Sequence, residues 1–124
     1  MRVYEAIVRG LEDIGVDAAF GGAGENAAGL MLALDASETI RPIITKNEQA
    51  AAFMACGYAM FTNKLGVCFA TAGPGALNLI SGLSVALTDS YPLLARAVAR
   101  ATRDRQRDDH EQRQRRRGTK SHRT

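Results

Sequence analysis

The chain has no tryptophan and few of the side chains that hold metals or form disulfide bonds. Its 124 residues include two cysteines and two histidines. Cys56 and Cys68 lie in a helix-like and a strand-like segment, without the spacing of a metal site or a redox pair, so we expect buried, reduced thiols. His110 and His122 both lie near the C-terminus, which leaves no histidine for acid–base chemistry in the folded part.

Long apolar runs are also absent. No stretch reaches the roughly 18 residues that a membrane-spanning helix needs. The first ten residues, MRVYEAIVRG, lack the charged-then-apolar layout of a signal peptide. We therefore expect a cytoplasmic protein without a membrane partner.

Positive charge is scarce until the end of the chain. Residues 1–95 carry five basic and nine acidic groups, a net charge of −4, whereas residues 96–124 carry eleven basic and four acidic groups, a net charge of +7. After Val98 there is no large apolar side chain to offset the loss of chain entropy on folding. We predict a folded domain over residues 1–95 and a basic, disordered tail over residues 96–124. Nucleic acid is a disfavoured partner for this tail, because acids are interspersed in it and it has no aromatic side chain for stacking.

Helix-like and strand-like segments alternate along residues 2–95. Apolar residues at helical spacing predict the helices, and short β-prone runs between them predict the strands. The predicted helices are residues 2–14, 25–35, 48–61 and 76–87, and the predicted strands are residues 16–20, 40–45 and 65–70, with a fourth strand starting near residue 91. Pro42 favours an edge or entry position for the second strand.

This alternation is typical of an α/β fold with an open, mostly parallel sheet and helices on both faces, doubly wound as in flavodoxin-like proteins. The globular pattern ends near residue 95. It leaves open whether the sheet is complete at its C-terminal edge.

Two glycine turns and one acid follow the predicted strands, at the edge where such sheets bind ligands. The first turn, residues 22–27, matches the dinucleotide fingerprint G-x-G-x-x-A. A short helix follows it, however, and Glu25 puts negative charge where a pyrophosphate would bind. A dinucleotide-binding Rossmann domain, a plain turn and a non-catalytic α/β binding or regulatory module are the alternatives at this point.

Three longer stretches agree in order and spacing with one family. They are FGGAGEN (residues 20–26), TKNEQAAAFMACGYAMFTNKLGVCFATAGPGALNLISGL (residues 45–83) and ALTDSYPLLA (residues 86–95). Together they resemble the N-terminal, pyrimidine-binding domain of the thiamine-diphosphate enzymes that act on 2-oxo acids, most closely the acetolactate (acetohydroxyacid) synthases. The resemblance covers residues 2–95.

The resemblance implies a catalytic role for Glu48. In this family, the glutamate of the Asn/His-Glu-Gln motif hydrogen-bonds N1′ of the cofactor's aminopyrimidine and favours the imino tautomer that deprotonates the thiazolium C2. Without the resemblance, Glu48 would be interpreted as a first-turn helix acid interacting with the helix dipole. The implied cofactor-binding residues are Gly22, Ala23, Gly24, Glu48, Thr71, Pro74 and Asn78. Ala23 departs from the family pattern, because many relatives carry proline there.

The resemblance also implies a substrate, a second cofactor component and a partner. Pyruvate or a similar 2-oxo acid would be decarboxylated and joined to an acceptor, as in branched-chain amino acid biosynthesis. The family holds the diphosphate and Mg²⁺ on a separate domain through a Gly-Asp-Gly run, which this chain lacks. We therefore expect no metal ligand here, only the pyrimidine half of the thiamine diphosphate site, and an inactive isolated chain.

The missing half-site would come from a second copy in a homodimer or from a diphosphate-binding domain or subunit. The abrupt change to Arg-rich sequence near residue 96 suggests a truncated or frame-shifted reading of a longer gene. A naturally separate subunit is the other hypothesis.

Overall fold

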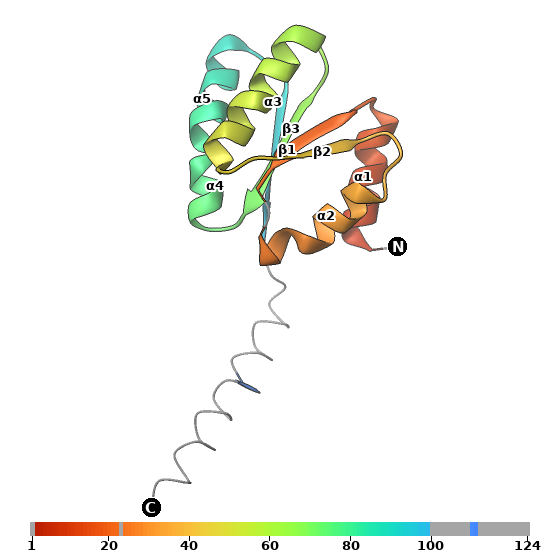
Figure 1. The fold of residues 1–124 in the computed structure, drawn as a ribbon. Coiled ribbons are helices and arrows are strands. Elements are labelled where there is room, and N and C mark those ends of the chain that lie inside the picture. Colours follow the sequence, from red (N-terminus) through yellow and green to blue (C-terminus); the bar gives the residue numbers. More distant parts are fainter. Residues whose placement is uncertain (1, 23, 100–109, 112–124) are drawn as a thin grey trace, which may run out of the picture.

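Four parallel strands form one open sheet in the computed structural model, which describes residues 2–22, 24–99 and 110–111. The strands are β1 (Ala18–Gly21), β2 (Arg41–Ile44), β3 (Gly66–Thr71) and β4 (Leu93–Val98), and they lie side by side in the order β2-β1-β3-β4. The helices α1 and α2 lie on one face of the sheet, and α3, α4 and α5 lie on the other (Figure 1). This arrangement confirms the predicted open, parallel α/β sheet.

The helices are α1 (Val3–Asp13), α2 (Ala28–Asp35), α3 (Glu48–Thr62), α4 (Pro74–Asn78) and α5 (Ile80–Asp89), with a 3₁₀ turn, η1 (Glu25–Ala27), before α2. The helix predicted over residues 76–87 is two helices in the structure. The first begins earlier, because Pro74 occupies a first-turn position where its missing N–H costs nothing. The break comes at Leu79, whose N–H bonds to the carbonyl of Ala76, three residues back, at 3.2 Å.

The domain boundary predicted at residue 95 falls inside β4, which runs to Val98 at the edge of the sheet. Most of the predicted tail, residues 100–109 and 112–124, lies outside the described residues. No helix in the described ranges has both the length and the apolar character that crossing a bilayer requires.

Alternate residues of the central strands feed two separate cores. Ala19, Val67 and Phe69 face α1 and α2, whereas Cys68 and Ala70 face α3 and its neighbours. Both faces of β3 are covered, and its first five residues are buried. By contrast, the edge strand β2 is only partly buried, as its proline predicted.

Small side chains let α3 pack closely on the sheet and on α5. A Cβ added at Gly82 in α5 would lie 2.5 Å from the Cβ of Ala52, and one added at Gly66 in β3 would lie 2.2 Å from the carbonyl oxygen of Ala55. Neither distance is compatible with van der Waals packing. The glycines at positions 82 and 66, which face α3, therefore set how far this helix lies from α5 and the sheet.

Both cysteines are buried free thiols, as the sequence predicted. Burial raises the pKa of the Cys68 thiol to about 11. Burial, and then the nearby charge of Asp89, raises the pKa of the Cys56 thiol. An exposed thiol in an unfolded chain ionises near pH ~8.5.

We expect this shift at Cys68 to make the fold less stable in alkali. Between the two pKa values the unfolded chain binds fewer protons than the folded one. The stabilisation that the buried, protonated Cys68 thiol contributes is therefore complete below pH ~8.5 and is lost as the pH rises toward about 11. The stability difference between the wild-type chain and Cys68→Ala should therefore shrink between about pH 8 and about pH 10.5, as measured by urea unfolding. Other titrating groups are common to both proteins and cancel. A difference that does not change with pH would contradict the prediction.

Candidate functional site

The carboxyl ends of β1, β2 and β3 meet at one edge of the sheet. Gly21, the last residue of β1, pairs with Ile44 of β2 and with Phe69 of β3. The N–H of Thr45 also donates to the carbonyl of Gly21 at 2.8 Å, which keeps the exit of β2 beside the turn after β1. The candidate residues taken from the sequence all follow one of these strands or end it.

The N-terminus of α3 is fixed by an asparagine cap. Asn47 has extended backbone angles, and its Oδ1 accepts a hydrogen bond from the N–H of Ala50 at 2.7 Å. The hydroxyl of Thr45 donates to the carbonyl of Asn47 at 2.7 Å and ties the cap to the end of β2. Because the cap decides where the helix begins, Glu48 becomes its first residue.

Glu48 is a partly buried residue, and its carboxylate lies between two groups from α4, Asn78 and Gly75. Its Oε2 accepts a hydrogen bond from Nδ2 of Asn78 at 3.1 Å. Its Oε1 lies 3.1 Å from the position that a Cβ on Gly75 would take, and the same Cβ would lie 3.6 Å from the Cβ of Ala70. The absence of a side chain at Gly75 therefore gives the carboxylate its place beside the end of β3.

The turn after β1 contacts the end of β3. A Cβ added at Gly24 would lie 2.5 Å from Oγ1 of Thr71, and one added at Gly22 would lie 3.9 Å from the carbonyl oxygen of Thr45. In the second turn, Gly73 has a φ of +93°, which L side chains rarely adopt. The backbone of the first glycine turn therefore comes close to the strand ends, and the second turn requires glycine for its backbone conformation.

The structure thus brings four of the candidate residues together in two groups at the carboxyl ends of the strands. Glu48 and Asn78 form the first, and Gly24 and Thr71 form the second. Gly22 follows β1 directly, and Pro74 begins α4 with its side chain exposed. Ala23 lies outside the described residues.

Two features of the site were not predicted. The resemblance indicated Asn78 as a cofactor contact but not as the hydrogen-bond partner of Glu48, and the contact between the Glu48 carboxylate and Gly75 was not predicted. The two side chains in the hydrogen bond are 30 residues apart in the sequence, so no local pattern connects them. Within the described ranges, no group of three or more His, Cys, Asp or Glu side chains could hold a metal ion.

A family comparison identifies the class of protein to which this site belongs. The family described as "Thiamine pyrophosphate enzyme, N-terminal TPP binding domain" matches residues 1–119. The chain therefore belongs to the N-terminal TPP-binding domains of thiamine pyrophosphate enzymes. The match continues past the change of composition at residue 96.

Among individual proteins, the chain is similar to acetolactate synthases. It is 46% identical over 91 residues to acetolactate synthase 2, chloroplastic, of Brassica napus and 42% identical over 91 residues to acetolactate synthase of Mycobacterium bovis. It is also 41% identical over 91 residues to the acetolactate synthase large subunit of Corynebacterium glutamicum. These alignments cover 73% of this chain but only 14%, 15% and 14% of the respective relatives, so the chain spans a small part of their length.

These findings confirm the family resemblance that the motifs carried. They give no support to the dinucleotide interpretation of residues 22–27 or to a non-catalytic module.

Proposed function

We propose that this chain supplies the pyrimidine half-site of an acetolactate-synthase-like enzyme. The substrate is pyruvate or a related 2-oxo acid, which is decarboxylated and joined to an acceptor. One observation carries the proposal: the Glu48 carboxylate lies at the carboxyl ends of the strands, accepts a hydrogen bond from Asn78 and packs against the backbone of Gly75. Membership of a TPP-binding family and the similarity to acetolactate synthases support it.

The chemistry of the site suits a flat heteroaromatic ring. The glycines at positions 24 and 75 let the Thr71 hydroxyl and the Glu48 carboxylate lie against the backbone at the strand ends, because an added Cβ would lie 2.5 Å and 3.1 Å from their oxygens. Thr71 offers a hydroxyl and Glu48 offers carboxylate oxygens, and together they match a ring that has both donors and acceptors. The residues present therefore fit the aminopyrimidine of thiamine diphosphate.

Thiamine diphosphate, when bound, supplies the electron sink for decarboxylation of a 2-oxo acid. In our proposal Glu48 would hold and move a proton at a ring nitrogen of the bound aminopyrimidine. Asn78 positions the carboxylate by donating to Oε2, which leaves Oε1 directed to the side of Gly75. Thr71 and Gly24 position the ring at the end of β3.

The diphosphate and Mg²⁺ require groups from elsewhere, because the Gly-Asp-Gly run is missing from this sequence. We place them on a diphosphate-binding domain or subunit, or on another copy of the complete enzyme, that packs over the Glu48 edge. Several large apolar side chains near this edge support such a partner, because they are exposed in the single chain. They are Phe53 of α3, Leu77 of α4 and Ile80 of α5.

A chimera tests the proposal. The segment of this chain that aligns over 91 residues with the Corynebacterium glutamicum large subunit would replace the matching segment of that protein. With thiamine diphosphate and Mg²⁺ added, we expect the chimera to consume pyruvate. A chimera that folds and binds the cofactor but does not consume pyruvate would contradict the proposed activity.

A further inference from the structure

Four charged side chains of alternating sign follow one side of the first helix. Arg2 precedes α1, and Glu5, Arg9 and Glu12 lie within it. Their spacings of three, four and three residues keep them on one face of an α-helix, over a length of about 15 Å. We call these four residues the α1 charge stripe.

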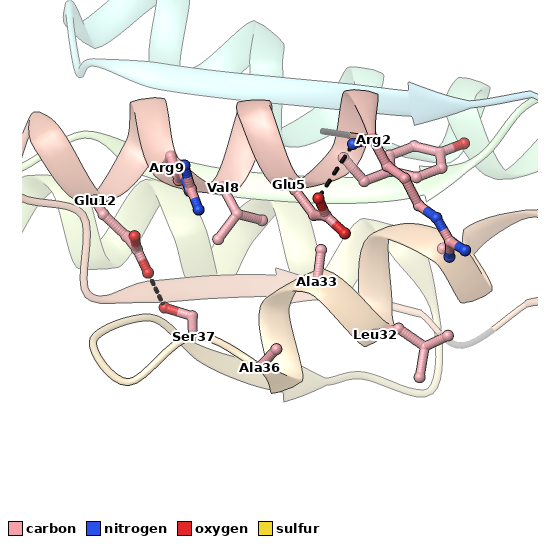
Figure 2. A pocket seen from close by; sticks show the side chains of 11 residues that line it. Arg2, Glu5, Val8, Arg9, Glu12, Leu32, Ala33, Ala36 and Ser37 are labelled. Atoms are coloured by element: carbon pink, nitrogen blue, oxygen red, sulfur yellow. Dashed lines mark hydrogen bonds between the residues drawn. The ribbon is translucent and has the colours of Figure 1, made fainter.

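The α1 charge stripe borders a groove between α1 and the end of α2 (Figure 2). The groove has a volume of about 450 Å³, with Ala33, Ala36 and Ser37 on the side of α2. Leu32 stands on its rim with 68% of its surface exposed. Tyr4 packs on α2 at Gly29, where an added Cβ would lie 2.6 Å from its ring, so the two helices are held close at this end.

The charges of the stripe do not neutralise one another within the chain. Glu5 accepts a hydrogen bond from the backbone N–H of Arg2 at 3.1 Å, and Glu12 accepts one from the hydroxyl of Ser37. The guanidinium groups of Arg2 and Arg9 form no ion pair with any carboxylate of the described residues. Each carboxylate keeps lone pairs free for a further donor, and both arginines keep their donors.

The order of the charges is self-complementary. From N- to C-terminus the α1 charge stripe is positive, negative, positive, negative, so a second stripe running in the opposite direction places an opposite charge against each one. Arg2 then faces Glu12 of the other copy, and Glu5 faces Arg9. A parallel arrangement is disfavoured, because it would place like charges together. An anionic ligand is also disfavoured, because on the arginines it would lie next to the carboxylates of Glu5 and Glu12.

We propose that the α1 charge stripe is a surface for a second copy of this chain, packed antiparallel about a two-fold axis midway between Glu5 and Arg9. Such a contact is isologous, as two-fold interfaces are. The arginine stems and Leu32 supply the apolar part. The contact depends mainly on exposed charge pairs, which contribute little each, so the association is weak and is weakened further by salt.

Charge exchange between two variants tests this inference. In Arg9→Glu, and separately in Glu5→Arg, two of the crossed pairs become repulsive, so we expect self-association of the full chain to weaken by about tenfold or more. In an equimolar mixture of the two variants, each altered residue faces an opposite charge again, so association should return as a heterodimer. Intrahelical effects cannot produce this recovery, because each chain keeps its own altered helix.

Sedimentation equilibrium at low and at high salt measures the association, and circular dichroism checks that each variant folds. Arg41→Glu, which makes the same charge change at an exposed site on β2, is the matched control and should associate like the wild-type chain. If Glu5→Arg does not fold, the outer pair Arg2→Glu and Glu12→Arg serves in the same mixing design. A wild-type chain that stays monomeric at low salt, an association that Arg9→Glu leaves unchanged, or a mixture of folded variants that does not associate would each overturn the inference.

Discussion

Replacing Glu48 by glutamine is expected to lower pyruvate turnover by the chimera by about a hundred- to ten-thousandfold, the range that a positioned acid–base group contributes. Glutamine has nearly the same shape and can still accept the hydrogen bond from Asn78, which Glu48 accepts at 3.1 Å. It cannot hold or release a proton at the position of Oε1. The loss should therefore fall on kcat, while cofactor binding changes much less.

The control for this experiment is Glu38→Gln, which changes an exposed acid between α2 and β2. It removes the same charge from the chain and should leave turnover unchanged. Thermal unfolding of both chimeras shows whether the fold is intact. If folded Glu48→Gln retained turnover within about twofold of the parent chimera, an acid–base role for this residue would be excluded.

Replacing Gly82 by alanine is expected to destabilise the fold, although alanine is the better helix former by about 1 kcal/mol. The added Cβ would lie 2.5 Å from the Cβ of Ala52 and 2.7 Å from its carbonyl carbon, so α3 and α5 must move apart. Overpacking of a well-packed core costs about 1–3 kcal/mol, and here the obstacle is partly backbone. We therefore expect a net loss of about 1–3 kcal/mol in the free energy of unfolding, a large fraction of a domain's total stability.

Gly57→Ala provides the matched control within α3. A Cβ at this helical position meets nothing within 4 Å, so only the gain in helix propensity applies. The variant should be more stable than the wild-type chain by about 0.5–1 kcal/mol. Urea unfolding of the two variants should give shifts of opposite sign. If Gly82→Ala were as stable as Gly57→Ala, the close approach of α3 and α5 would not be a feature of the folded protein in solution.

Local sequence chemistry predicted most of the elements that position the site. The alanine-rich run from residue 48 predicted a helix, the run of residues 65–70 has the apolar character of a strand covered on both faces, and Pro42 indicated an edge strand. All three appear in the structure. In each case the physical cause, a run of helix formers, an apolar run or a missing N–H donor, acts within a few residues and can be recognised from the sequence.

Contacts between distant segments could not be predicted in the same way. The break at Leu79 could not be predicted, because the apolar pattern of residues 76–87 continues through it. In the structure the Leu79 side chain is almost fully buried against α3 and the sheet. The place of the Glu48 carboxylate depends on Gly75 and Asn78, which only the folded sheet brings near it. The α1 charge stripe was not predicted either, because the partners of its carboxylates are known only from the folded chain.

The packing of α3 on the sheet limits where the length of the chain can vary. Its buried residues, beginning at Ala51, fix the rotation of the helix about its axis. One residue added between Glu48 and Ala51 would rotate Glu48 by about 100° relative to them and turn the carboxylate away from α4, even if every other residue were kept. Gaps in an alignment with catalytically competent relatives should therefore not fall in this first turn of α3.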